Sequence, residues 1–154
     1  CLAYSLLRLA DYKQNDVLVD PLCKDGTLLI EAGLINGKKI YGFDNNLYNI
    51  KNSEVNSKLA KVKINLIKAD ISWLGTKFKK NSVDKIVTAI FVHKRNKDDS
   101  IKQIKELFYQ SKNILKNKLV ILSNIDLEKY SIDFKLDKKY NINIGDNLYK
   151  IHIL

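Results

Sequence analysis

The chain has 154 residues, of which 45% are hydrophobic and 29% charged, a composition that suits one folded domain with its own core. Its apolar runs fall short of the roughly 20 residues that cross a bilayer, and it shows no secretory leader. Two cysteines and two histidines exclude a disulfide framework and most zinc sites. We therefore expect one metal-free domain, residues 1–154, in the cytoplasm.

The chain is strongly basic, with a net charge of +10 and a pI near 9.5. The charge is uneven, because the window 77–105 holds nine Lys or Arg residues against three Asp residues. Two interpretations are open. Binding to a polyanionic partner such as nucleic acid would explain this charge, and so would the lysine-rich composition that an AT-rich genome produces.

Hydrophobic periodicity predicts alternating helices and strands along the chain. The apolar run at 17–19, which Asp20 and Pro21 end, is typical of a buried parallel strand. The next helix is expected to begin at Gly26 and Thr27, with Thr27 as its N-cap, and to end near Gly37. The other expected helices lie at 2–10, 45–60 and 101–115, and the other expected strands at 39–43, 63–68, 83–89 and 119–122.

The end of the chain has a different pattern. Residues 140–144 and 148–154 alternate between apolar and polar side chains, and Gly145-Asp146-Asn147 joins them as a hairpin. Strand–helix alternation followed by a hairpin predicts an α/β, Rossmann-like fold. Its open, mainly parallel sheet carries helices on both faces and ends in an antiparallel C-terminal hairpin.

An aspartate follows each of the first three predicted strands: Asp20, Asp44 and Asp70. Open α/β sheets bind ligands beyond the carboxyl ends of their strands, where a carboxylate accepts ribose hydroxyl protons. An acid after the first strand would repel a dinucleotide pyrophosphate, but it suits the positive sulfonium and ammonium of S-adenosylmethionine (SAM). The chain also lacks G-x-G-x-x-G, so SAM is favoured over the NAD of an oxidoreductase. Taken singly, Asp70 is better explained as an ordinary loop carboxylate or helix cap, whereas for Asp20 and Asp44 that interpretation and a ligand role fit equally well.

Residues 17–32, VLVDPLCKDGTLLIEA, resemble the opening motif of the THUMP-associated RNA methylases, D-P-x-C-G-S-G-T followed by an apolar stretch and E-A. Residues 2–10, 40–44, 68–70 and 142–146 are similar to other parts of that catalytic domain. The resemblance implies a class I SAM-dependent methyltransferase fold. It also implies methylation of the exocyclic N2 of guanine in tRNA or rRNA, with an upstream RNA-binding THUMP domain. Since the chain contains no Met, we expect residues 1–154 to be the C-terminal part of a longer protein.

The same resemblance implies roles for particular residues. Asp20 and the backbone of the cofactor loop would line the methionine part of SAM, Asp44 would hold the ribose, and Asp70 the adenine amine. In that loop, however, Cys23-Lys24-Asp25-Gly26 replaces the family's C-G-S-G. Glycine permits a close backbone approach that Lys24 and Asp25 restrict. The cofactor site is therefore either obstructed, or intact with Lys24 directed to solvent.

A second departure follows the fourth strand, where Ala89-Ile90-Phe91-Val92 replaces the family's N-P-P-Y. Aiming an exocyclic amine at a methyl carbon needs acceptors for its N–H groups, and Ala89 has none. No catalytic residue is therefore assigned. Phe91 either stacks on a base or packs on the core, and His93 is expected at the surface. Two hypotheses remain: an RNA methyltransferase with unusual site residues, or an inactive domain kept for RNA binding or structure.

Three basic residues follow this degenerate motif: Lys94, Arg95 and Lys97. Side chains of this kind bind RNA phosphates electrostatically, with a salt-sensitive affinity and little information about sequence. We expect these three to contact RNA.

Overall fold

The computed structural model describes all 154 residues and contains one seven-stranded sheet, in the order β3-β2-β1-β4-β5-β7-β6. Neighbouring strands among the first five are parallel, and β7 pairs antiparallel with both β5 and β6. The strands are β1 (Val17–Asp20), β2 (Lys39–Asp44), β3 (Asn65–Lys68), β4 (Val83–Ile90), β5 (Leu115–Ser123), β6 (Lys138–Ile144) and β7 (Asn147–Ile153).

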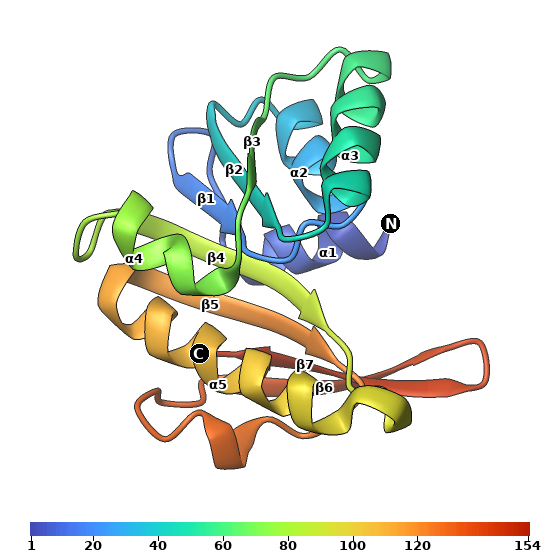
Figure 1. Cartoon of the computed structure of the whole chain (residues 1–154), viewed down its shortest axis with the longest axis vertical. Helices are drawn as coiled ribbons and strands as arrows, with labels where there is room; N and C mark the ends of the chain where they lie inside the picture. The colour runs from blue at the N-terminus through green and yellow to red at the C-terminus, as the bar shows by residue number, and fades with distance from the viewer.

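Helices cover both faces of this sheet (Figure 1). One face carries α1 (Leu2–Leu9), α2 (Thr27–Leu34) and α3 (Leu47–Leu59). The other carries α4 (Leu74–Lys77) and the long α5 (Lys97–Ile114). Three short 3-10 turns complete the chain: η1 (Ile71–Trp73), η2 (Lys94–Asn96) and η3 (Glu128–Tyr130).

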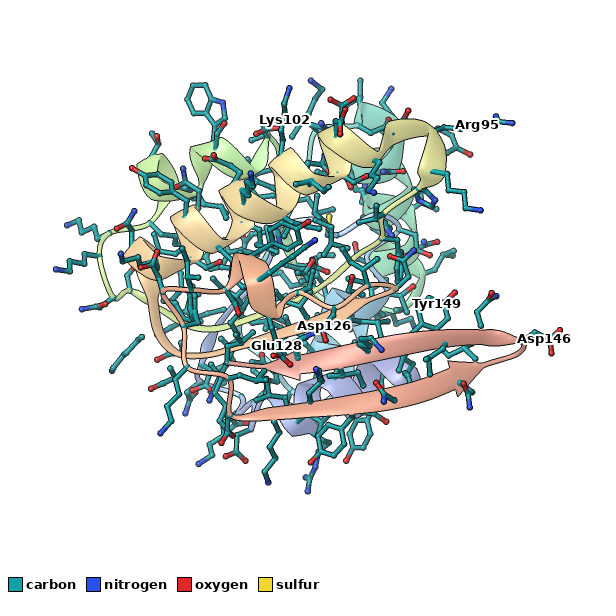
Figure 2. The ribbon with its side chains drawn as sticks, turned by 90° about the horizontal axis from the view of Figure 1, so that it is seen from below. Arg95, Lys102, Asp126, Glu128, Asp146 and Tyr149 are labelled. Atoms are coloured by element: carbon teal, nitrogen blue, oxygen red, sulfur yellow. The ribbon has the colours of Figure 1, made fainter.

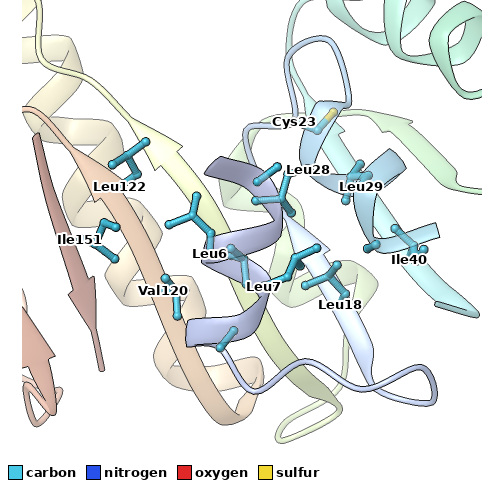
Figure 3. Packing of buried hydrophobic residues seen from close by; sticks show 14 of the residues in the cluster. Leu6, Leu7, Leu18, Cys23, Leu28, Leu29, Ile40, Val120, Leu122 and Ile151 are labelled. Atoms are coloured by element: carbon cyan, nitrogen blue, oxygen red, sulfur yellow. The ribbon is translucent and has the colours of Figure 1, made fainter. Parts of the chain in front are cut away.

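Two apolar clusters, one on each face, hold the layers together. Helix α1 packs between α2 and the strands β4, β5 and β7, as the positions of Leu6, Leu7 and Ile151 in Figure 3 show. On the opposite face, Ile104 and Leu107 of α5 are fully buried against the sheet. Both faces of the central strands are therefore dry, which explains why those strands are short continuous apolar runs.

The predicted architecture is confirmed, including the parallel sheet, the helices on both faces and the C-terminal hairpin. One predicted detail is wrong: Gly26, with φ 81°, is the N-cap of α2, and Thr27 is its first residue. The Asp25 carboxylate accepts hydrogen bonds from the Thr27 backbone N–H and hydroxyl, at 3.2 and 2.9 Å. The short elements η1, α4, η2 and η3 were not predicted, because elements of three or four residues are too short to show periodicity. No helix is long and apolar enough to cross a membrane.

Gly42 of β2 lets the loop after β1 approach the sheet. A Cβ built there would lie 3.1 Å from Cys23 and would overlap Leu29 Cδ1 of α2. We therefore predict that Gly42→Ala lowers the free energy of unfolding by about 1–3 kcal/mol, the usual cost of overpacking a core. Urea denaturation measures this, and the same glycine change should cost less in a Leu29→Val background, which lacks Cδ1. An equal cost in both backgrounds would show that the clash is not the cause.

Candidate cofactor and RNA site

The acids predicted as ligands lie at the carboxyl ends of three parallel strands. Asp20 ends β1, Asp44 ends the neighbouring β2, and Asp70 follows β3. Because the chain order of the strands reverses between β1 and β4, this end of the sheet carries the crevice in which open α/β folds bind ligands. Asp20 and Asp44 are buried, whereas Asp70 is exposed and caps η1 by accepting a hydrogen bond from the Ser72 N–H at 3.0 Å.

The Asp20 carboxylate is held by one oxygen only. Its Oδ1 accepts hydrogen bonds from the Thr88 hydroxyl of β4, at 2.7 Å, and from the Leu22 N–H, at 3.1 Å. No protein donor reaches Oδ2. Burial is the main cause that raises the pKa of Asp20 to about 6, against the lowering effect of these hydrogen bonds and of the Lys24 charge. Asp20 therefore keeps one oxygen available for a donor that the protein does not provide.

Asp44 organises the start of α3 and the cofactor loop together. Its Oδ2 accepts a hydrogen bond from the Lys24 N–H at 3.1 Å, and its Oδ1 accepts from the Asn46 N–H at 2.9 Å and the Asn49 amide at 3.1 Å. A carboxylate offers about four lone-pair positions, so three protein donors leave roughly one for a ligand. The position of the carboxylate is thus fixed before any ligand binds.

The cofactor loop, residues 23–26, is held by hydrogen bonds from side chains of α3. The Ser53 hydroxyl donates to the Lys24 carbonyl at 2.6 Å, and the Asn56 amide donates to the Asp25 carbonyl at 3.0 Å. Lys24 has φ 50°, in the left-handed region that costs a residue with a Cβ about 1–2 kcal/mol. The loop therefore holds Lys24 in a backbone conformation that favours glycine.

A cavity of about 240 Å³ opens between this loop, α1 and the ends of β4 and β5. It is lined by Asp20 and by Cys23, Lys24 and Asp25 of the cofactor loop, together with residues such as Ala89 at the end of β4. Burial, with the nearby Asp20 and Asp44, raises the pKa of the Cys23 thiol to about 12, so this sulfur stays protonated and is no nucleophile. The cavity therefore combines an apolar wall with one free carboxylate oxygen, a combination that suits an amino-acid ammonium group.

The segment after β4 offers no amide side chain to this cavity. Ala89 carries only a methyl group. The amide of Asn124, which follows β5, is already hydrogen-bonded to the backbone of Val92. Its Oδ1 accepts from the Val92 N–H at 2.8 Å, and its Nδ2 donates to the Val92 carbonyl at 2.9 Å. Phe91 is half-buried, packs on the core cluster of α1 and contacts Tyr149 of β7 edge to face, with ring centroids 5.6 Å apart.

The basic residues after β4 are exposed and form no ion pair. Lys94, Arg95 and Lys97 lie on η2 and at the start of α5, and His93 just before them is exposed too. The basic window of the sequence is nevertheless not one surface. Residues 77–80 precede β4, whose eight residues span about 26 Å, so they lie at the opposite end of the sheet.

The C-terminal hairpin extends past the same end of the sheet. Because Ser123, the last residue of β5, pairs with Lys150, residues 142–149 project beyond it. In Figure 2 the hairpin tip at Asp146 and Arg95 both lie at this end of the molecule, with Tyr149 near them. The hairpin and η2 thus lie at the same end of the sheet as the crevice.

Several residues that shape this site had no sequence signal. No local motif indicates the hydrogen bonds by which Thr88 holds Asp20, Ser53 the cofactor loop, Asn49 Asp44, and Asn124 Val92. Only Asn49 is close in sequence to the residue that it holds. The other three act on segments 29 to 68 positions away, which only the folded chain brings together.

The buried acid Asp20 generates a prediction about stability. An acid whose pKa is raised by folding destabilises the native state once ionised, so the penalty grows as pH rises from about 4 through 6. Asp20→Asn keeps the Oδ1 acceptor, and we predict that it raises the free energy of unfolding by about 1–3 kcal/mol at pH 8 and by almost nothing at pH 4. Urea titrations at both pH values measure this. The exposed Asp70→Asn is the control, and a gain equal at both pH values would contradict the prediction.

Comparison with known proteins agrees with this geometry. Residues 1–144 match the family described as UPF0020, RMKL-like methyltransferase domain. A probable tRNA (guanine(10)-N2)-dimethyltransferase from Methanothermococcus thermolithotrophicus is 31% identical over 99% of this chain and 96% of its own length. The tRNA (guanine(10)-N2)-dimethyltransferase of Methanocaldococcus jannaschii is 39% identical over 40% of this chain, which corresponds to 19% of that protein.

Solved structures share the fold. TrmN from Thermus thermophilus superposes with a TM-score of 0.86 at 21% identity, over 99% of this chain and 47% of TrmN. SMU.472, described as a candidate methyltransferase and complexed with S-adenosylhomocysteine (SAH), gives a TM-score of 0.82 at 17% identity, over 99% of this chain and 51% of that one. The chain thus spans about half the length of these two structures. The family match and the full-length relative together show that this chain belongs to the RMKL-like methyltransferase domain family.

Proposed function

We propose that this chain is the SAM-binding domain of an RNA methyltransferase directed at the exocyclic N2 of guanine in tRNA. The observation that carries the proposal is the pair of buried acids at the ends of adjacent strands, Asp20 and Asp44, with the cofactor loop hydrogen-bonded to Asp44. The family and the tRNA guanine-N2 specificity named for its relatives support the same reading.

In this proposal the two acids bind opposite ends of the ligand. The free Oδ2 of Asp20 accepts a hydrogen bond from the amino-acid ammonium, and the remaining lone pair of Asp44 accepts from a ribose hydroxyl. Cys23, Lys24, Asp25 and Gly26 line the methionine part. Asp70 is assigned to the adenine amine, although it lies exposed as the cap of η1 and is the weakest member of the set. SAM supplies the methyl group.

A second candidate function is a domain that binds the cofactor and RNA but transfers no methyl group. The observation that favours it is the lack of a free side-chain acceptor at the end of β4, where Ala89 stands and Asn124 is engaged by the Val92 backbone. Without such an acceptor, the lone pair of a guanine amine is not aimed at the methyl carbon.

Calorimetric titration with SAH tests the cofactor assignment. We predict binding at pH 8, weakened at least tenfold by Asp44→Ala, since that change removes both the ribose acceptor and the anchor of the Lys24 N–H. Asp146→Asn, at the exposed hairpin tip, is the control and should bind SAH like the wild type. Unchanged affinity in Asp44→Ala would contradict the assignment. Transfer of labelled methyl from SAM to bulk tRNA then separates the two candidate functions.

The RNA surface generates a prediction about salt dependence. Changing Lys94, Arg95 and Lys97 together to Gln should reduce the slope of log affinity against log salt by about 2, since each phosphate contact contributes roughly 0.7 on single-stranded RNA. Lys77, Lys79 and Lys80 changed together to Gln remove the same charge at the opposite end of β4, and they are the matched control. Filter binding of tRNA at several salt concentrations measures both slopes. Equal slopes in the two triple variants would place the RNA surface elsewhere.

A further inference from the structure

The two places where this chain departs from its family lie in contact. The Lys24 Nζ atom is 4.5 Å from the centroid of the Phe91 ring, a distance typical of a cation–π interaction. Tyr149 packs against the same ring and helps to fix its position. The side chain of Lys24 therefore crosses from the cofactor loop to the segment after β4, over the crevice where strand order reverses.

The backbone of Lys24 is fixed as well. The Lys24 N–H donates to Asp44 Oδ2, and its carbonyl accepts from the Ser53 hydroxyl. Lys24 lines the same cavity as Asp20 and lies near enough to favour ionisation of that carboxyl group. Its positive charge thus lies beside Phe91 and near Asp20, on a side chain that is exposed at the cavity.

This position places the charge near one atom of the ligand in the proposed function. If Asp20 takes the ammonium end and Asp44 the ribose, the sulfur is the atom that lies between them, beside Lys24. In SAM that sulfur is a positively charged sulfonium, and in SAH it is a neutral thioether. Two positive charges repel each other, and at a separation of about 7 Å, with the effective dielectric constants of about 40 to 80 that suit an exposed side chain, the repulsion changes affinity by roughly 3- to 7-fold.

We propose that Lys24 makes this site selective for the neutral thioether SAH over the cationic SAM. Lys24 is then the residue that sets ligand specificity, acting through its charge. The inference rests on the proposed function, since it needs the ligand to lie between Asp20 and Asp44. In this proposal the shape of the loop still admits the ligand. The charge of Lys24 makes the site bind the demethylated product more tightly than the methyl donor.

Calorimetry with both ligands at pH 8, where Asp20 is ionised, tests the proposal. Lys24→Met keeps most of the length of the side chain and removes its charge, so the ratio of the SAM to the SAH dissociation constant should fall about 3- to 7-fold. Any effect on the ammonium group, which both ligands carry beside Asp20, cancels in that ratio. Lys24→Arg keeps the charge and should keep the wild-type ratio of the two dissociation constants. Lys24→Gly also relieves the left-handed backbone conformation, and it reports the effect of bulk together with charge.

The outcomes separate this inference from the proposed function. A ratio of dissociation constants that is the same in the wild type and Lys24→Met would overturn the selectivity and leave the cofactor assignment standing. Equal tightening of both ligands, seen only in Lys24→Gly, would show that bulk and not charge matters, and would overturn it too. Binding of neither ligand to any folded variant, checked by thermal denaturation, would overturn the proposed function and this inference with it.

Discussion

The shape of the candidate site depends on hydrogen bonds that join the first loop to the second strand. Asp44 receives the Lys24 N–H, and Ser53 and Asn56 of α3 donate to the carbonyls of Lys24 and Asp25. None of these three side chains lines the cavity that Asp20 and Lys24 share. Because their hydrogen bonds compensate for the left-handed conformation of Lys24, a residue with a long side chain holds a position that suits glycine.

The sheet topology explains why acids distant in sequence act together. Parallel strands all end at the same edge, and the buried acids of β1 and β2 therefore become neighbours without any contact between their side chains being needed. Burial raises the pKa of Asp20. The Asp44 carboxylate is also buried, but it accepts hydrogen bonds from three protein donors. One acid is left partly unsatisfied and the other almost fully satisfied, which suits a charged ligand group at the first and a hydroxyl at the second.

Most of the fold could be predicted from the sequence, because buried parallel strands are short apolar runs and the hairpin alternates around a glycine turn. The acids at the strand ends could be predicted for the same reason: they interrupt those runs. The contact between Lys24 and Phe91 could not be predicted, since each residue had a separate local interpretation and only the fold brings them together. The basic window 77–105 does not form a single surface, because β4 runs through it and separates its ends.

The first residue of the chain also lies at the site. Cys1 is exposed and lines the same cavity as Asp20 and Lys24, whereas Cys23, the other thiol in the chain, is buried with a raised pKa. The two sulfurs therefore differ strongly in access to reagents, although they lie along one cavity. A maleimide dye should attach to Cys1 in preference to Cys23. Its fluorescence would then report directly on what enters or leaves the cavity.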